Sequence, residues 1–389
     1  MSMEKSLDNP SRKFKYFIED YWDIFLGVFS ILLAFYFHSS HQGGLATLFA
    51  AIGIGSLSLS VSEIAEILSE RLQEPYGSFV LTLSAVVVEI ILMYIILLQA
   101  FEDPQVIETV KSGIAAAVIV DMNVLLGLAV FLGGLKFQEQ EHNKETSSAY
   151  TTILFVATIA LLVPSLLNQS KHTLATLEEV SIIISGLLMV FYIFILRFQV
   201  KTHTHFFKQT ARSRIFRLKR KMQEESEDNQ SEDDYIFEKL GNAWLIASIF
   251  IFVAIIALGA EVFAHDGVKF AKEYGFSAAL SGLIIAIVAV SPEIMTAIKA
   301  AKNDEIQRVV NIAMGASTVS ILLTVPILMA LAYSSGIRLT LGFSPLEIGA
   351  LILTVILAWK TTDEGHTNYF EGISHLIFFS AFAIIAIYY

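Results

Sequence analysis

The hydrophobic residues of this chain are gathered in eleven long runs, separated by polar segments that are short in all but one case. A run of about 17 to 25 apolar residues can cross the hydrocarbon core of a bilayer as a helix. The pattern predicts transmembrane helices near residues 22–38, 45–68, 77–99, 107–134, 149–167, 178–199, 241–264, 277–301, 306–334, 344–360 and 371–388. We therefore expect an all-α polytopic membrane protein with eleven transmembrane helices.

The one long polar segment changes sign along its length. A basic stretch, RSRIFRLKRK, precedes an acidic one, EESEDNQSEDD. The basic stretch contains apolar residues as well, so it predicts an interfacial helix that would contact anionic lipid. The alternative is a plain solvated linker. The acidic stretch lacks the alternating ligands of an EF-hand, and we expect it to be disordered.

This linker divides the chain into two similar halves. We expect an N-terminal segment with the first helix at 1–40, a five-helix repeat at 41–199, the cytoplasmic linker at 200–240 and a second five-helix repeat at 241–389. The second helix of each repeat has a central glutamate, Glu89 or Glu293, and the helix before it has Glu66 or Glu261. Because five is odd, the second repeat enters the membrane inverted, as in secondary transporters.

The stretch around Glu293 is unusual for a transmembrane helix. An ionisable group at this depth costs roughly 2.5 to 3.5 kcal/mol and usually marks an ion or proton path. Pro292 cannot donate to the carbonyl of Val288, which leaves that oxygen free for a cation. The alternative is a packing kink, with a protonated Glu293 bonded to a neighbouring helix.

Composition supports a membrane protein and restricts its partners. Hydrophobic residues make up 55% of the chain and charged residues 16%, whereas soluble domains are about 25% charged. The net charge of −11 argues against nucleic acid, which selects for basic surfaces. There is no cysteine, which excludes disulfides and thiolate metal sites.

Lysine and arginine are unevenly distributed over the predicted loops. Cytoplasmic loops collect these residues. If the N-terminus is cytoplasmic, the residues that fall on the outer side are Lys111, Lys171, Lys269, Lys272 and Arg338, against 21 on the cytoplasmic side among the 26 in the chain. We therefore expect a cytoplasmic N-terminus and an outer C-terminus.

The histidines do not predict a catalytic or metal site. We expect loop or helix-end positions for His38, His41, His172, His265 and His366. His203 and His205 lie in the linker and would make only a weak two-ligand metal site. His375, within the last helix, is expected to be a bonded core residue.

Several stretches together resemble the cation/proton exchanger family of the calcium/cation antiporter superfamily, most closely its bacterial ChaA-type branch. They include EPYGSFVLTLSAVVVEIIL with Glu89, MNVLLGLAVFLGGLKFQEQE with Asn123, SPEIMTAIKAAKN with Glu293, NIAMGASTVSILLTVP with Ser317 and NYFEG with Glu371. The resemblance covers residues 22–389 and implies export of calcium, with sodium and potassium as further cations, in exchange for protons. It also implies a bacterial inner membrane.

The resemblance implies roles for individual residues. Glu89 and Glu293 would bind the cation or protons, with Asn123 and Ser317 beside them. Glu66 and Glu261 correspond to accessory acidic positions that relay protons or gate the path. The family's Gly-Asn pairs are replaced here by Ala85-Val86 and Ala289-Val290, so a sodium-potassium/proton antiporter with little calcium activity is the alternative.

The proposed chemistry needs no cofactor beyond the transported cation and protons. Two carboxylates at the membrane midplane repel when both are ionised, so they hold protons or a cation, and the two occupancies exclude each other. The carbonyl of Val288 and the side chains of Ser84 and Ser291 are further oxygen donors. Asp121 is either a third acidic ligand or a locally bonded residue, because it and Asn123 are about 200° apart on a regular helix.

Two other classes of protein fit the sequence less well. An intramembrane enzyme would use buried carboxylates too, but the chain has no HExxH pair, G-x-S-x-G elbow or phosphate-binding glycine loop. A channel would show a ring of charges or a repeated filter. The sequence therefore favours a transporter.

Overall fold

The computed structural model describes residues 10–72, 76–168, 174–208 and 236–388. Within these ranges, eleven helices are long and apolar enough to cross a membrane, which confirms the predicted number. The predicted interfacial helix and the acidic stretch of the linker lie outside the described residues. Many apolar side chains on the outer faces of the helices are exposed, as expected where lipid surrounds a protein.

The first half of the chain contains α1 (Pro10–Ser39), α2 (Gly43–Arg71), α3 (Tyr76–Leu98), α4 (Val106–Val120), η3 (Asp121–Leu125), α5 (Leu126–Phe137), β1 (Glu139–Glu141), α6 (Lys144–Asn168) and α7 (Leu174–Arg197). The second half contains α9 (Ile236–Lys239), α10 (Asn242–Glu273), α11 (Ala278–Lys302), α12 (Ile306–Val319), η7 (Ser320–Thr324), α13 (Val325–Ser334), α14 (Pro345–Thr362), β2 (His366–Asn368) and α15 (Tyr369–Tyr388). Short helical turns also follow α3 and α7, at Gln99–Phe101, Phe198–Thr202 and Thr204–Phe207.

The helices agree closely with the predicted ones except at the start of α1, which begins at Pro10 and not near 22, and at the end of α10. This helix continues to Glu273, well past the predicted end at 264. The added residues are largely polar, but Gly267 approaches Thr47 and the ring of Phe270 lies over Gly44 of α2. Contact with α2 therefore accounts for the extension, and it places His265 inside a helix and not in a loop.

The third span of each predicted five-helix repeat contains a five-residue π-helical segment. In the first half this is η3, between α4 and α5, and in the second half it is η7, between α12 and α13. Such segments are rare and are frequent at functional sites. Their matching positions are consistent with two five-helix repeats.

A two-stranded antiparallel ladder is the exception to the all-helical prediction. Strands β1 and β2 pair Glu139 with Asn368 and Glu141 with His366. The side chain of Gln140, between them, donates to the Ala301 carbonyl at 3.0 Å and to Asp304 at 3.0 Å. The ladder joins the loop after α5 to the loop after α14, and both loops are on the same side in an eleven-span topology.

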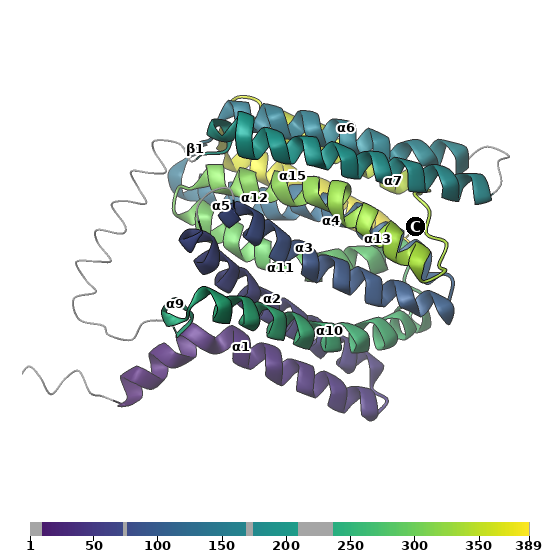
Figure 1. The fold of residues 1–389 in the computed structure, drawn as a ribbon, viewed down its shortest axis with the longest axis horizontal. Coiled ribbons are helices and arrows are strands. Elements are labelled where there is room, and N and C mark those ends of the chain that lie inside the picture. Colours follow the sequence, from purple (N-terminus) through teal and green to yellow (C-terminus); the bar gives the residue numbers. More distant parts are fainter. Residues whose placement is uncertain (1–9, 73–75, 169–173, 209–235, 389) are drawn as a thin grey trace, which may run out of the picture.

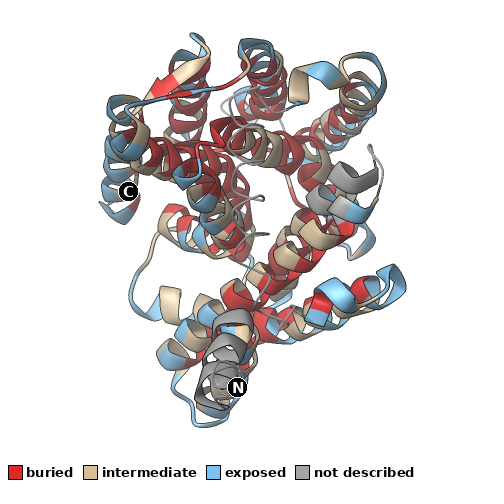
Figure 2. Cartoon of the chain, turned by 90° about the vertical axis from the view of Figure 1, so that its left-hand side faces the viewer, coloured by how far each residue is buried: buried red, intermediate tan, exposed pale blue. Residues whose placement is uncertain are grey.

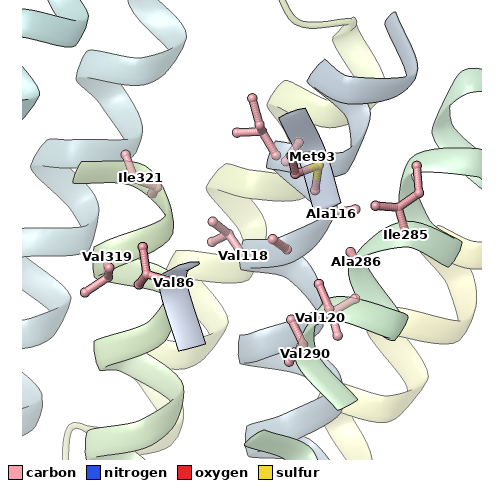
Figure 3. Packing of buried hydrophobic residues seen from close by; sticks show 14 of the residues in the cluster. Val86, Met93, Ala116, Val118, Val120, Ile285, Ala286, Val290, Val319 and Ile321 are labelled. Carbon is pink, nitrogen blue, oxygen red and sulfur yellow. The ribbon is translucent and has the colours of Figure 1, made fainter. Parts of the chain in front are cut away.

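Two groups of helices lie on opposite sides of a central core. Helices α1, α2 and α10 pack together on one side of the molecule, whereas α6 and α7 lie on the opposite side (Figure 1). Buried residues concentrate between these groups (Figure 2). The core includes Val86, Val290 and Val319 (Figure 3).

Candidate cation and proton site

Three buried carboxylates from three elements face the same part of the interior. Glu89 is on α3, Asp121 begins η3 and Glu293 is on α11. The charges of Glu89 and Glu293 both act on Asp121, and the charge of Glu89 acts on Glu293. The structure therefore brings together the two glutamates expected from the repeats and adds Asp121 to them.

Glu89 is held by hydroxyl groups of the second π-helical segment. Ser320 donates to its carboxylate, with Oγ 3.0 Å from both oxygens, and Thr324 donates to Oε2 at 3.0 Å. Neither residue was predicted from the sequence. Their spacing of four, which places two hydroxyls on one helical face, is the signal that could have found them.

Glu293 is in a different environment, because it lines a cavity between α2, α3 and α11. The atom Oε2 is buried and has no hydrogen-bond partner. The cavity is lined by Ser58, Val61, Ser62, Ser84, Ala85, Val88, Ala289, Pro292 and Glu293. Ser84, predicted as an oxygen ligand, lies here. The hydroxyl oxygens of Ser58, which donates its own proton to the Ile54 carbonyl, and of Ser62 are further oxygens at the cavity that the sequence pattern did not single out.

Asp121 is almost completely buried, at 1% exposure. Its Oδ2 accepts a hydrogen bond from Ser317 Oγ at 3.1 Å, whereas Oδ1 is buried without a partner. The predicted donor Ser317 thus contacts the acidic cluster through Asp121. One oxygen of Asp121 and one of Glu293 are left without a donor, and each could bind a cation or carry a proton.

Asn123 makes its hydrogen bonds elsewhere. Its Nδ2 donates to the Ile119 carbonyl at 3.0 Å and to Thr354 Oγ1 at 2.9 Å, and its Oδ1 lies 3.0 Å from Nδ1 of His375. Thr361 bonds the other ring nitrogen of His375, so His375 is the bonded core residue that was predicted. A role for Asn123 as a cation ligand stays a prediction and would require these bonds to rearrange.

The break at Pro292 is closed by a side chain. Ser291 Oγ donates to the Val288 carbonyl at 2.8 Å, in place of the amide that proline lacks. A carbonyl oxygen has a second lone pair, so the role of Val288 as a ligand stays a prediction. Ser291 itself is committed to this carbonyl in the structure.

The two accessory acidic residues lie outside the cluster of three carboxylates. Glu66 forms an ion pair with Arg308 at the start of α12. Glu261 is exposed on the surface of α10. Neither placement tests a relay or gating role, and those roles remain predictions.

Most of the chain matches one known protein family. A sequence model described as "Sodium/calcium exchanger protein" matches residues 42–201 and 244–388. The chain belongs to this family. The chain is therefore a multi-pass membrane transporter and not an enzyme.

Individual members of the exchanger family are similar over most of their length. The Sodium-potassium/proton antiporter ChaA of Escherichia coli is 27% identical over 338 residues, covering 86% of this chain and 87% of the relative. The Ca(2+)/H(+) antiporter ChaA of Bacillus subtilis is 26% identical over 282 residues, covering 72% and 74%. The Ca(2+)/H(+) antiporter of Synechocystis is 24% identical, covering 77% and 78%.

Solved structures share the fold. The structure of native YfkE superimposes with a TM-score of 0.74 at 20% identity, covering 94% of this chain and 99% of that one. The H+/Ca2+ exchanger CAX superimposes with a TM-score of 0.68 at 13% identity, covering 97% and 92%. The eleven spans are thus arranged as in these exchangers.

Proposed function

We propose that this chain is a cation/proton antiporter that exports calcium, and also sodium or potassium, in exchange for protons by alternating access. The observation that carries the proposal is the cluster of Glu89, Asp121 and Glu293, in which two buried oxygens have no donor. Relatives of similar identity are named as calcium/proton and as sodium-potassium/proton antiporters, which supports this class of substrates.

The cluster couples the two substrates through charge. Ionised carboxylates at this depth are costly unless something compensates their charge. Protons can do so, and so can a cation, but one carboxylate oxygen cannot serve both at once. Cation binding therefore releases protons and proton binding releases the cation, which is the requirement for exchange.

The ligand set suits a hard cation. Calcium takes six to eight oxygen ligands, and three carboxylates with the hydroxyls of Ser317, Ser320 and Thr324 provide enough oxygens. The side chains of Val86, Val290 and Val319 are buried and offer no further ligand oxygen. The alternative is a sodium-potassium/proton antiporter with little calcium activity, since monovalent cations need fewer compensating charges.

We further propose a bacterial inner membrane as the location, with the N-terminus in the cytoplasm and the C-terminus outside. The distribution of lysine and arginine supports this orientation. Two helix ends that meet in the structure agree with this orientation. Arg71, at the end of α2, donates to carbonyls of Glu238 and Leu240 before α10, so these two ends share one side.

The test uses everted membrane vesicles that carry the chain and an imposed pH gradient. Adding calcium, sodium or potassium separately should dissipate the gradient for the transported cations. We expect Glu89→Gln and Glu293→Gln to abolish this dissipation, because each removes an ionisable group of the cluster. The exposed Glu364→Gln should leave it unchanged. Full activity in either cluster variant would contradict the site, and no dissipation by any cation in the wild type would contradict the function.

A further inference from the structure

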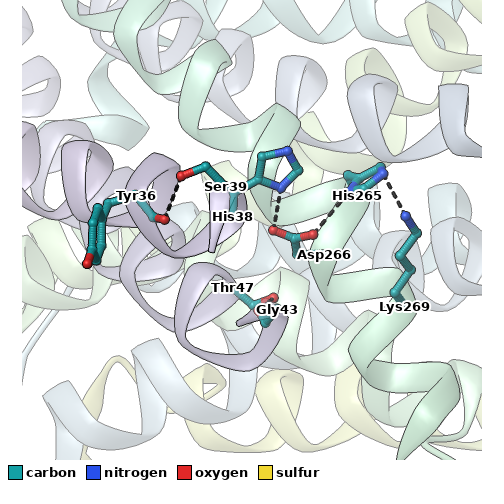
Figure 4. A network of polar contacts seen from close by, with 8 residues as sticks. All are labelled: Tyr36, His38, Ser39, Gly43, Thr47, His265, Asp266 and Lys269. Atoms are coloured by element: carbon teal, nitrogen blue, oxygen red, sulfur yellow. Dashed lines mark hydrogen bonds and ion pairs between the residues drawn. The ribbon is translucent and has the colours of Figure 1, made fainter. Parts of the chain in front are cut away.

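A second group of charged side chains lies where α1 ends, against the C-terminal part of α10. His38 Nδ1 is 2.8 Å from Asp266 Oδ2, and His265 Nδ1 is 3.0 Å from Asp266 Oδ1 (Figure 4). The two imidazole rings lie 5.2 Å apart between their centroids. One ligand atom from each residue lies within 4.8 Å of the others. No other part of the chain that the structure describes brings three such residues together so closely.

The group combines a nearly buried carboxylate, Asp266, with two partly exposed imidazole rings. The side chain of Asp266 is 10% exposed, whereas those of His38 and His265 are 40% and 33% exposed. The carboxylate thus lies in the protein interior, between the two rings, and the rings reach the surface (Figure 4). An ion could approach from the surface that the two rings reach and keep a water molecule as a fourth ligand.

The ligand chemistry points to a borderline-soft cation. Imidazole nitrogen suits zinc, copper and nickel, whereas calcium and magnesium prefer oxygen ligands. Zinc binds histidine nitrogen and carboxylate oxygen at about 2.0 to 2.2 Å in a tetrahedral arrangement, which separates neighbouring ligand atoms by roughly 3.3 Å. His38 and His265 contact different oxygens of Asp266, at 2.8 and 3.0 Å. Because one ligand atom from each residue already lies within 4.8 Å of the others, small side-chain rotations would bring the set to this spacing.

We propose that His38, His265 and Asp266 form a binding site for a divalent transition metal of the zinc class. The site is separate from the transport site, because it uses α1 and α10, whereas the carboxylate cluster uses α3, η3 and α11. A bound metal would replace the protons that the two rings now share with Asp266. It would fasten the end of α1, which precedes the two repeats, to the first helix of the second repeat.

Lys269 opposes metal binding in this arrangement, because its contact with Nε2 keeps the ring proton of His265 on Nδ1, the atom that would bind the metal. Its Nζ lies 2.8 Å from Nε2 of His265 (Figure 4), where it supplies a positive charge to the group. The lysine is exposed, so it can turn toward solvent when an ion arrives. Removing its charge should therefore favour the metal, whereas removing a ring should weaken binding.

The experiment measures metal binding by the purified full chain in detergent. Titration calorimetry with zinc alone should give saturable binding of one ion, and cobalt should give the visible absorption bands of a tetrahedral site. Calcium should not displace either ion. We expect His38→Ala and His265→Ala to weaken zinc binding by about a hundredfold, since losing even an outer-shell partner costs about 10- to 100-fold.

Two matched controls separate this site from others. A double variant, His203→Ala with His205→Ala, removes another pair of histidines, which the predicted topology places on the opposite side of the membrane, and it should bind zinc as the wild type does. Glu293→Gln should also keep the zinc site, so loss of transport and loss of zinc binding are distinguishable. Lys269→Gln should bind zinc roughly fivefold more tightly, a gain that misfolding cannot produce.

Three outcomes would overturn the proposal. The first is absence of zinc binding by the wild-type chain. The second is unchanged binding in both His38→Ala and His265→Ala, and the third is equal competition by calcium, which would place the ion at the carboxylates. A variant that unfolds without metal would be recognised by its thermal transition, and Lys269→Gln then decides the matter.

Discussion

At the scale of single residues, the two glutamates of the cluster differ in what surrounds them. Glu89 accepts hydrogen bonds from Ser320 and Thr324, whereas Glu293 Oε2 has no donor. Hydroxyl donors stabilise an ionised carboxylate, and a buried carboxylate without donors needs a proton or a cation. The two glutamates that the sequence pairs thus differ in their surroundings, and we expect Glu293 to depend more on a bound proton or cation.

The hydroxyl donors of Glu89 can be tested directly. Ser320→Ala removes the donor that lies 3.0 Å from both oxygens. A hydrogen bond to a charged group contributes about 1.5 to 3 kcal/mol, so we expect the cation concentration for half-maximal exchange to rise by roughly tenfold or more. The measurement is exchange in vesicles over a range of cation concentrations.

The control for this change is Ser380→Ala, which removes an exposed hydroxyl that bonds only to Leu376 of its own helix among the described contacts. It should leave the cation dependence unaltered. If Ser320→Ala behaves in the same way, then the η7 hydroxyls do not assist Glu89 in binding.

At the scale of elements, close helix packing depends on small residues. A Cβ atom on Gly282 of α11 would lie 2.5 Å from the amide nitrogen of Gly113 and 2.6 Å from the Ser112 carbonyl carbon on α4. Small residues allow this approach of backbones in membrane proteins. The contact fixes α11, and with it Glu293, against the span that contains Asp121.

Gly282→Ala should therefore destabilise the protein. Overpacking of a tight contact costs about 1 to 3 kcal/mol, because backbone atoms must move apart. The measurement is the thermal unfolding temperature in detergent. Gly349→Ala is the matched control, since a Cβ there meets no atom within 4 Å. Equal unfolding temperatures for the two variants would show that the α4 and α11 backbones can separate freely.

The ladder of β1 and β2 has a titratable residue beside it. The His142 amide donates to the Gly365 carbonyl at 2.9 Å, and its ring contacts the Thr362 carbonyl at 3.1 Å. Burial lowers the pKa of His142 below its usual value, opposed by the bond to Thr362 and reinforced by the nearby charge of His366. The folded protein thus holds this histidine neutral.

Acidification should consequently destabilise the ladder. Since the folded-state pKa is lowered, the unfolded chain binds more protons, and the stability falls as the pH drops below about 6.5 toward the folded-state pKa. We expect the decrease in unfolding temperature between pH 8 and pH 5.5 to be smaller in His142→Gln than in the wild type. His205→Gln, at an exposed position, should show the wild-type decrease. An identical pH dependence in His142→Gln would rule out this contribution.

At the scale of the whole molecule, the contacts between loops agree with one topology. The β1–β2 ladder joins the loops after α5 and α14, and the ion pair of Lys272 with Asp103, at 2.8 Å, joins the end of α10 to the loop before α4. With eleven spans and a cytoplasmic N-terminus, the first contact is cytoplasmic and the second is outside. Each contact joins loops that this topology places on the same side.

Single cysteines can test this topology, because the chain has no cysteine of its own. Both chosen positions are exposed in loops. Glu102→Cys should react with a membrane-impermeant maleimide in right-side-out vesicles, and Asp363→Cys should react only in everted ones. The reverse pattern would invert the orientation, and labelling of both positions from one side would contradict the eleven-span topology.

The sequence by itself determined the number of spans, and it singled out Glu89 and Glu293, two carboxylates that the structure buries. Each of these follows from local properties, namely the length of apolar runs and the cost of a charge within one of them. Asp121 can also be identified from the sequence alone, because a carboxylate within an apolar run is unusual whatever its neighbours are.

Only the tertiary structure decided which polar groups meet. The π-helical segments turn Asp121 toward Ser317, while Asn123 bonds to Thr354 and His375. The extension of α10 along α2 places His265 and Asp266 beside the end of α1. Asp266 contacts His38 there although 228 positions separate the two residues in the sequence. Such contacts depend on how helices distant in sequence pack, because a helical pattern gives the face of a residue but not the side chain that faces it.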